Sequence, residues 1–238
     1  MPFYNEEECV VGVVTDLLAA CAADGLAFEI VAIQNGSHDR TEELLKGLAT
    51  QHPQLRIIGI EVNKGYGFGV INGLKAAQGD YLAYMAGDGQ VSPEDVLKVF
   101  SAMKERGLDF CQGCRAVRQV GLHRKMVSKV FNTLFRVLFR NSINDIGSNP
   151  KIMKRDLYAK ILPVSYDWFI DSEVLLKTAA LGARMAEVPV LFKKRETGKS
   201  HINILAVLEM LRNMFVWKSR VLSGKIMRYT GTGEVYGK

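Results

Sequence analysis

The sequence lacks the features of secreted, membrane-spanning and disulfide-stapled proteins. Four cysteines among 238 residues are too few and too scattered for a disulfide framework. The start of the chain lacks the basic residues and apolar core of a secretory signal. No apolar run reaches the roughly 18 residues of a spanning helix, because Asp16, Asp24, Arg136 and Arg212 interrupt the candidates. We therefore expect a cytoplasmic protein that can lie on a membrane without crossing it.

Other absences exclude whole classes of protein. With 48% hydrophobic and 24% charged residues, and with only 22 Gly and 6 Pro, the chain is neither disordered nor fibrous. The four histidines have no metal-ligand spacing, and neither Gly-x-Ser-x-Gly nor His-Glu-x-x-His occurs, which excludes a serine-hydrolase elbow and a zinc-protease site. What remains is a globular chain, long enough to fold without disulfides or a structural metal.

Acidic residues are absent from one long stretch, which the net charge of +6 conceals. Residues 1–114 carry 8 basic and 16 acidic side chains, residues 115–140 carry 7 basic and no acidic ones, and residues 141–238 carry 16 and 9. The basic second half favours an anionic partner, such as a phospholipid surface or a phosphorylated substrate. Nucleic acid is not expected as a partner, because no recognised reading module accompanies the charge.

Short β-branched runs alternate with helical patterns through the first half. Strands are predicted over residues 28–33, 55–62, 81–85 and 110–114, with helices between them. This alternation predicts an α/β fold with a mostly parallel central sheet and right-handed crossovers. Ligands of such sheets bind beyond the carboxyl ends of the strands. The loops expected to line this cleft span residues 34–41, 63–69 and 86–92.

The second half is less regular and reads as a C-terminal elaboration of the same domain. Its predicted elements are helices near 122–140, 156–162, 167–181 and 202–217 and a strand over 185–192. The helix over 122–140 has an apolar stripe from Met126 to Leu138 with basic residues on both sides. Such a helix either packs against a core or lies in an anionic leaflet, and the absence of acids favours the leaflet.

The turn after the predicted strand 81–85 is the most informative stretch. It places Asp88 and Gln90 two residues apart, before Pro93 starts a helix. A carboxylate and an amide oxygen on one loop suit a hard divalent cation that completes its shell with water and substrate phosphates. An ordinary Asp-Gly turn explains the same residues equally well.

Three further segments carry groups that suit a phosphate. They are the glycine-rich loop 63–69 with Lys64, the strand end at Arg115, and the basic turn 195–200. Empty turns and surface cations are the simpler alternative in each case. Asp171 and Glu173 lie in the first turn of a predicted helix, where the helix dipole also favours acids.

Taken in order, these segments resemble glycosyltransferase family 2, and most closely its polyprenyl-phosphate (dolichol-phosphate mannose synthase-like) branch. The resemblance implies a GT-A fold in one domain over residues 1–217, with a nucleotide-sugar half over 1–114 and an acceptor- and membrane-facing half over 115–217. A tail spans 218–238. The segments that carry the resemblance are 2–7, 35–41, 63–69, 79–93, 113–115, 145–155, 187–189 and 195–200.

The resemblance also implies residue roles. It implies an inverting transfer of a hexose from GDP-mannose or UDP-glucose, with Mg²⁺ or Mn²⁺ as the cofactor. The residues implied to bind the nucleotide sugar are Pro2, Tyr4, Glu6, Asn35, Ser37, Asn63, Lys64, Gly65 and Asp88. Those implied to hold the metal are Asp88 and Gln90. Those implied to meet the acceptor phosphate are Arg115, Arg124, Arg195, Lys199 and Ser200. Asp171 or Glu173 acts as a base only if the acceptor is a sugar hydroxyl.

Three functional hypotheses follow. The leading one is a transferase on the cytoplasmic face of the membrane that uses a polyprenyl phosphate, an acceptor already ionised at neutral pH. The alternatives are transfer to a polysaccharide or other hydroxyl acceptor, and a non-catalytic protein that binds nucleotide sugar. Ala86 stands where the metal loop of the family usually has a second acid, and Gln34-Asn35 stands where two Asp are usual. The metal is therefore expected to bind more weakly, while Asn35 can still hydrogen-bond the edge of the nucleotide base but offers a donor and no charge.

The sequence starts at the Pro that ends the first strand in the family it resembles. We expect the buried part of that strand to be largely absent and this form of the chain to be poorly stable. A chain with an added upstream strand should melt at a higher temperature.

Overall fold

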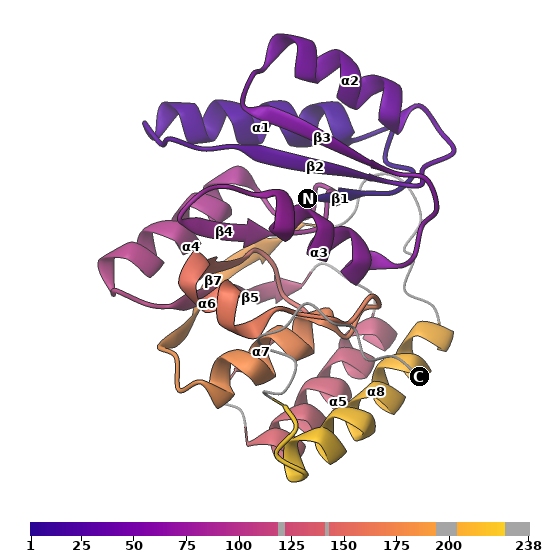
Figure 1. Cartoon of the computed structure of the whole chain (residues 1–238), viewed down its shortest axis with the longest axis vertical. Helices are drawn as coiled ribbons and strands as arrows, with labels where there is room; N and C mark the ends of the chain where they lie inside the picture. The colour runs from indigo at the N-terminus through magenta and orange to yellow at the C-terminus, as the bar shows by residue number, and fades with distance from the viewer. Residues whose placement is uncertain (119–121, 141–142, 194–203, 227–238) are drawn as a thin grey trace.

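The computed structural model of the chain describes residues 1–118, 122–140, 143–193 and 204–226. Its elements lie in three tiers along the long axis (Figure 1). A three-stranded sheet with two helices forms one end, a four-stranded sheet lies in the middle, and two long helices form the other end. The predicted α/β class is confirmed.

The first sheet is parallel, with the strand order β1-β2-β3. Its strands are β1 (Pro2–Phe3), β2 (Ile30–Asn35) and β3 (Leu55–Ile60). The helices around it are α1 (Val10–Ala23), α2 (Thr41–Gln51) and α3 (Tyr66–Ala76). All six residues of β2 are buried, because α1 and α2 share a core with one face of the strand and Gly73 of α3 packs against Ile33 on the other. This explains why β2 reads as a continuous apolar run.

The second sheet is mixed, with the order β4-β6-β5-β7. Its strands are β4 (Tyr81–Tyr84), β5 (Phe110–Arg118), β6 (Lys151–Lys154) and β7 (Met185–Phe192). β5 and β7 are parallel, whereas β6 runs antiparallel to both β4 and β5. The sequence pattern did not predict β6, because two apolar residues between lysines are too short a signal.

Five further helices complete the described part of the chain. They are α4 (Pro93–Glu105), α5 (Leu122–Phe139), α6 (Arg155–Ile161), α7 (Ile170–Ala180) and α8 (Ile204–Leu222). α4 begins at Pro93 as predicted, and the others lie within a few residues of their predicted ranges, except that α8 continues past residue 217, where the predicted tail begins. α1 is the one described helix that the sequence pattern did not indicate.

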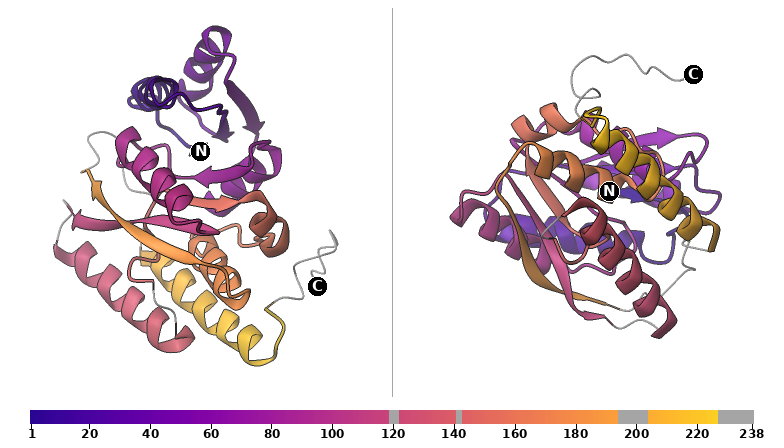
Figure 2. Two further views of the ribbon diagram at one scale, coloured as in Figure 1. Left: turned by 90° about the vertical axis from the view of Figure 1, so that its left-hand side faces the viewer. Right: turned by 90° about the horizontal axis from the view of Figure 1, so that it is seen from below.

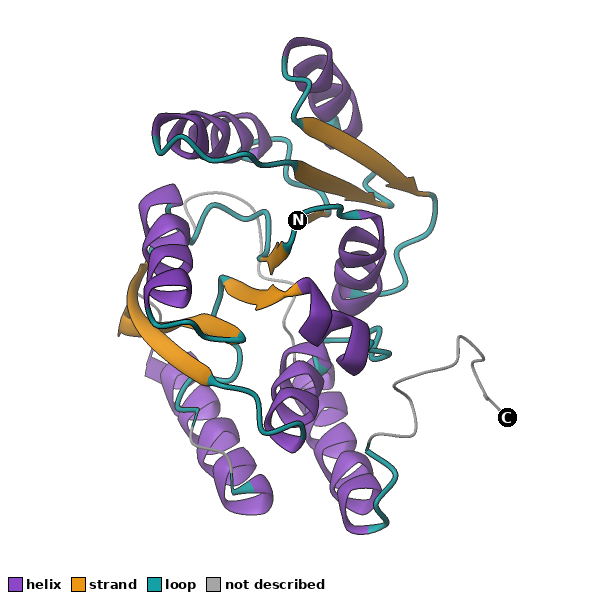
Figure 3. Ribbon diagram, turned by 60° about the vertical axis from the view of Figure 1, so that its left-hand side comes forward, coloured by secondary structure: helices purple, strands orange, loops and turns teal. Residues whose placement is uncertain are grey.

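The two sheets do not share a strand, because β1 has only two residues (Figure 3). A cavity of about 290 Å³ lies between them, and β2 and β4 supply its two sides. Most of its lining is apolar, including Leu17, Val31, Leu74, Leu82 and Phe100. The Met1 amine donates a hydrogen bond to the Val31 carbonyl at 2.8 Å, and burial lowers the pKa of that amine to about 5. The cavity therefore has apolar walls on both sides, as a strand that is buried on both faces requires.

An apolar segment of about five residues joined before Met1 should enter this cavity as a strand parallel to β2. We expect the melting temperature to rise by at least about 5 °C, because each newly buried side chain contributes about 1.5–3 kcal/mol. The peptide bond also replaces a buried amine that is costly to protonate. Differential scanning calorimetry of this chain beside one with a Gly-Ser extension of equal length checks the expectation, and equal melting temperatures would contradict it.

None of the helices in the described ranges is both long enough and apolar enough to cross a membrane. Two of them nevertheless expose apolar side chains at the far end of the molecule, where α5 and α8 lie side by side (Figure 2).

Candidate functional site

Loops that follow β2, β3 and β4 meet at one edge of the molecule. The Asn35 side chain donates to Asn63 Oδ1 and to the Gly65 carbonyl, each at 3.3 Å. The Gly87 N–H donates to the Pro2 carbonyl at 3.2 Å. At Gly36, with a φ of +74°, a Cβ would lie 2.6 Å from the backbone nitrogen of Asn63, so only glycine fits. The structure thus brings together the three loops that the carboxyl-edge rule selects.

The segment after β1 is fixed by side chains of the loop after β2. Ser37 Oγ accepts the Asn5 N–H at 3.1 Å, and Thr41 Oγ1 accepts the Glu6 N–H at 2.9 Å. Glu6 is buried. Pro2, Tyr4 and Glu6 therefore belong to the same edge as Asn35, although Ser37 is already used to hold the backbone.

Asn35 carries an unmatched acceptor. Its side chain is 3% exposed, and its Oδ1 is buried with no hydrogen-bond partner among the described residues. A buried acceptor without a donor costs about 1–3 kcal/mol. A ligand that presents an N–H at this point would remove that cost.

The loop before α3 keeps a cation close to this edge. Gly65, with a φ of +112°, starts the helix, and its N–H donates to Asn63 Oδ1 at 2.8 Å. The Lys64 ammonium lies 5.3 Å from the centroid of the Phe68 ring and is exposed. An exposed lysine beside the start of a helix is suited to a phosphate, whereas the Gly65 N–H already has its acceptor in Asn63.

The loop after β4 forms the Asp-Gly turn that the sequence left open as an alternative. Asp88 Oδ1 accepts the Gln90 N–H at 3.2 Å, and the Gln90 side-chain amide donates to the Lys193 carbonyl at 2.9 Å. Gln90 Oε1 and the Asp88 carboxylate are the groups to test against a cation. Within the described residues, no group of three or more His, Cys, Asp or Glu side chains could hold a metal. A divalent ion fits here only if a diphosphate and water complete its shell.

Arg115 is bound to a carboxylate. Its guanidinium donates to both oxygens of Asp145, with Nε to Oδ2 at 2.7 Å, and its backbone N–H meets Oδ2 at 3.2 Å. The guanidinium carbon also lies 5.1 Å from the centroid of the Phe192 ring. Arg115 is therefore ordered and charge-balanced, and only its remaining N–H groups are left for a phosphate. Its role toward an acceptor stays a prediction.

Asp171 lies in a buried ion pair. Its Oδ1 accepts from Lys151 Nζ at 2.9 Å and from the Tyr84 hydroxyl at 3.1 Å. Lys151 has no exposed surface, and burial lowers the pKa of its ammonium more than Asp171 raises it. Burial and the negative charges of Asp171 and Asp88 hold the pKa of Tyr66 well above its usual value. Asp171 and Asp88 thus share one electrostatic environment.

Glu173 is fully buried on the same helix. It pairs with Lys177 at 2.7 Å and accepts the backbone N–H groups of Val164 and Ser165 at 2.7 to 3.0 Å. Both Glu173 and Lys177 have side chains with no exposed surface. Because Glu173 is paired with Lys177 and has no exposed surface, this arrangement does not favour its role as a base, which stays a prediction.

Lys151, Tyr84 and Tyr66 were missed by sequence reasoning, although they surround Asp171. A lysine at the head of an apolar Ile-Met pair was a weak signal for Lys151. Of the predicted acceptor-phosphate group, Arg195, Lys199, Ser200 and the side chain of Arg124 lie outside the described residues.

Comparison with known proteins decides the family. The sequence model described as Glycosyl transferase family 2 matches residues 1–162, which is more than half of the chain. The chain belongs to glycosyl transferase family 2. Among curated relatives of this family 2 chain is the undecaprenyl-phosphate 4-deoxy-4-formamido-L-arabinose transferase of Pectobacterium atrosepticum, which is 30% identical over 217 residues. The match covers 90% of the chain and 64% of the relative's length. The transferase of the same name from Yersinia pestis is 28% identical, and the match again covers 90% of the chain and 64% of the relative's length.

Solved structures place the family 2 chain in the GT-A fold. Glucosyl-3-phosphoglycerate synthase from Mycobacterium tuberculosis, crystallised with Mn²⁺, UDP and phosphoglyceric acid, superposes with a TM-score of 0.69 at 19% identity, covering 94% of this chain and 76% of the other. Its form with Mg²⁺ and UDP gives a TM-score of 0.67 at 19% identity, covering 94% and 77%. At this identity the likeness establishes the fold alone.

Proposed function

We propose that this glycosyltransferase moves a sugar from a nucleotide donor to a polyprenyl phosphate. The observation that carries the proposal is the match, over 90% of the chain, to transferases named for undecaprenyl phosphate. The chain spans 64% of the length of those relatives, so the activity of the whole relative enters here as part of the proposal. The gathering of the three carboxyl-edge loops supports it, since a nucleotide sugar needs such a cleft.

The donor would bind at the edge built around Asn35. The unmatched Asn35 Oδ1 suits an N–H of a uracil or guanine base, and the exposed Lys64 ammonium suits the diphosphate. The resemblance implies a hexose, whereas the relatives are named for a formamido-arabinose. Both classes of sugar therefore belong in the donor panel.

Asp88 and Gln90 would hold Mg²⁺ or Mn²⁺ against the diphosphate. The bound ion neutralises charge that develops on the leaving nucleoside diphosphate. Gln90 fixes the loop through its bond to the Lys193 carbonyl, so that Asp88 keeps its position. With Ala86 in place of a second acid, we expect metal binding to depend on the nucleotide.

The acceptor would be a phosphate because the structure offers no freely accessible base at the expected positions. Asp171 is paired with Lys151 and Glu173 with Lys177. An ionised phosphate oxygen attacks without proton removal. A hydroxyl acceptor, by contrast, would require one of these acids to leave its pair.

A donor panel tests the proposal. The chain is incubated with radiolabelled UDP- and GDP-hexoses and with UDP-4-deoxy-4-formamido-L-arabinose, each with Mn²⁺ and undecaprenyl phosphate. We expect one donor to give label that partitions into organic solvent. Label found only in water-soluble polymer supports a hydroxyl acceptor instead, and nucleotide binding without product supports the non-catalytic alternative.

The surface of α5 and α8 would rest on the membrane. The two helices lie side by side, with Lys218 of α8 donating to the Leu138 carbonyl of α5 (Figure 2). Each helix buries one face and exposes another, with Met126, Val130 and Val137 on α5 and Leu208, Phe215 and Leu222 on α8 exposed at 58% to 75%. Basic side chains lie on the same two helices, which hold only one acid, Glu209. Apolar and basic groups together fit an anionic lipid surface.

Vesicle sedimentation tests this surface. We expect the chain to bind phosphatidylglycerol vesicles and to bind phosphatidylcholine vesicles weakly. Phe215→Glu should weaken the anionic binding at least about tenfold, because it removes an exposed aromatic ring that would enter the lipid surface and adds a charge of the same sign as the lipid. Val11→Glu, an equally drastic change on exposed α1 at the other end of the molecule, serves as the control. Equal loss in both variants would contradict the assignment.

A further inference from the structure

One connecting segment, residues 162–169 between α6 and α7, contacts residues 65–68 of the glycine-rich loop 63–69. We name residues 162–169 the strap. The Phe68 N–H donates to the Tyr166 carbonyl at 3.0 Å. Tyr66 stacks on Trp168 with ring centroids 4.7 Å apart, and Phe68 meets Tyr166 edge-on at 4.9 Å. The strap therefore touches the loop through both backbone and rings.

The glycines of the loop make this contact close. A Cβ on Gly65 would lie 2.4 Å from the Tyr166 carbonyl oxygen, and one on Gly67 would lie 2.2 Å from that of Ser165. Both distances are shorter than any non-bonded contact. The glycines thus fit the strap, which is a second reason for them besides the approach of a phosphate.

The other side of the strap is held by buried charges. Glu173 accepts the Val164 and Ser165 N–H groups, and Lys177 donates to the Leu162 carbonyl at 3.1 Å. This ion pair has no exposed surface, and breaking such a pair costs several kcal/mol. Glu173 and Lys177 therefore fix the backbone at the start of the strap.

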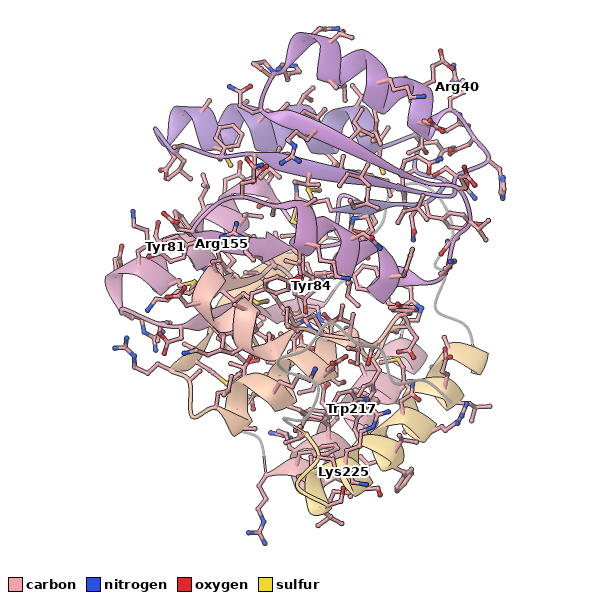
Figure 4. All side chains as sticks on the ribbon, viewed as in Figure 1. Arg40, Tyr81, Tyr84, Arg155, Trp217 and Lys225 are labelled. Atoms are coloured by element: carbon pink, nitrogen blue, oxygen red, sulfur yellow. The ribbon has the colours of Figure 1, made fainter. Side chains whose placement is uncertain are left out.

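Helix α8 holds the end of the strap. Asn213 donates to Asp167 Oδ2 at 2.7 Å, while Asp167 Oδ1 accepts the Phe169 N–H. Trp217 of α8, labelled in Figure 4, stacks on Phe169 with ring centroids 6.1 Å apart. The Lys177 ammonium lies 5.6 Å from the centroid of the Trp217 ring. The strap thus links α8 to the loop that leads to Asn35.

We propose that the strap positions the glycine-rich loop for the nucleotide, with Glu173, Lys177 and Asn213 as positioning residues. The inference rests on the proposed function, because it assigns the loop to the donor. It also gives Glu173 a role other than that of a base. The side chains that hold the strap need not touch the donor; they act by keeping loop 63–69 in one conformation.

Trp168 gives the sharpest test, because its ring reaches the loop. Trp168→Leu should weaken UDP or GDP binding, measured with Mn²⁺ by titration calorimetry, by about fivefold, the value of one aromatic pair. Trp168→Phe keeps the stacking and should restore binding to within about twofold. Asn213→Ala, on α8, should weaken binding at least about threefold. Tyr81→Leu is the control: it removes the aromatic pair of Tyr81 and Phe100, whose ring centroids are 5.3 Å apart. Tyr81 lies at the start of β4, away from the loop that follows its end, so binding should stay unchanged.

Hydrogen exchange separates this inference from the proposed function. Amides of residues 63–69 should exchange faster in Trp168→Leu and Asn213→Ala than in the parent chain, while amides of β2 stay protected. If the parent binds neither nucleotide, the proposed function fails. The exchange result alone then decides whether the strap fixes the conformation of loop 63–69. Unchanged exchange in loop 63–69, or nucleotide binding unchanged in Trp168→Leu, overturns the inference.

Discussion

Asp88→Asn should lower metal-dependent sugar transfer by at least about 10²- to 10³-fold, the usual effect of removing one preorganised electrostatic group at a reacting centre. Asp88 is the sole carboxylate of its loop, since Ala86 offers none. An amide at this position keeps the turn that accepts the Gln90 N–H but provides no negative charge for the cation. Measured initial rates with Mn²⁺ varied at fixed donor check the expectation.

Asp80→Asn is the matched control for that experiment. Asp80 is exposed and precedes β4, whereas Asp88 follows it, so the same chemical change is made at the opposite end of one strand. We expect the control to keep parental rates and parental dependence on Mn²⁺. Full activity in Asp88→Asn would remove Asp88 from the metal site.

Asp171→Asn should destabilise the fold by about 3–5 kcal/mol, because it leaves the fully buried Lys151 without its counter-ion. The loss should shrink as the pH rises toward the ordinary pKa of lysine. Burial already lowers the pKa of Lys151 in the folded state, so the unfolded chain binds more protons there and stability increases with pH. Urea unfolding at several pH values measures both effects.

The double variant Asp171→Asn with Lys151→Met separates folding from chemistry. It replaces the charged pair by neutral groups of similar size, and we expect most of the lost stability to return. If the acceptor is a phosphate, transfer should return with it. A double variant that is as stable as the parent but inactive would instead assign Asp171 as a base and favour a hydroxyl acceptor.

The donor side of the site could be predicted from sequence because it follows a local rule. The end of each parallel strand marks a loop at the carboxyl edge, so Asn35, Lys64 and Asp88 were selected together and do lie on loops that meet. The departures at Ala86 and Asn35 were also visible in the sequence. What the pattern could not give was the unmatched Asn35 oxygen, which depends on packing.

The side of the site around Asp171 and Glu173 could not be predicted, because it depends on contacts between residues that are distant in the sequence. Lys151 meets Asp171 only because the antiparallel β6 places it beside the end of β4. An acidic first turn gave no sign that Asp171 and Glu173 were already paired. The stripe on α5 was predicted either to pack against a core or to lie in a leaflet, whereas the structure buries its Phe131 and Phe135 and exposes its Met126 and Val130. The helical spacing of apolar residues alone does not show which residues of a stripe are buried in the core and which are exposed.

The central claim is that the sugar becomes linked to a polyprenyl phosphate, and one measurement tests it most directly. The parent chain is incubated with its labelled donor and Mn²⁺, with and without undecaprenyl phosphate, and the organic extract is treated with mild acid. The account predicts label in the extract only when the lipid phosphate is present, released by acid as free sugar because the bond joins phosphate to the anomeric carbon. Label that appears without the lipid, or that resists mild acid, would contradict it.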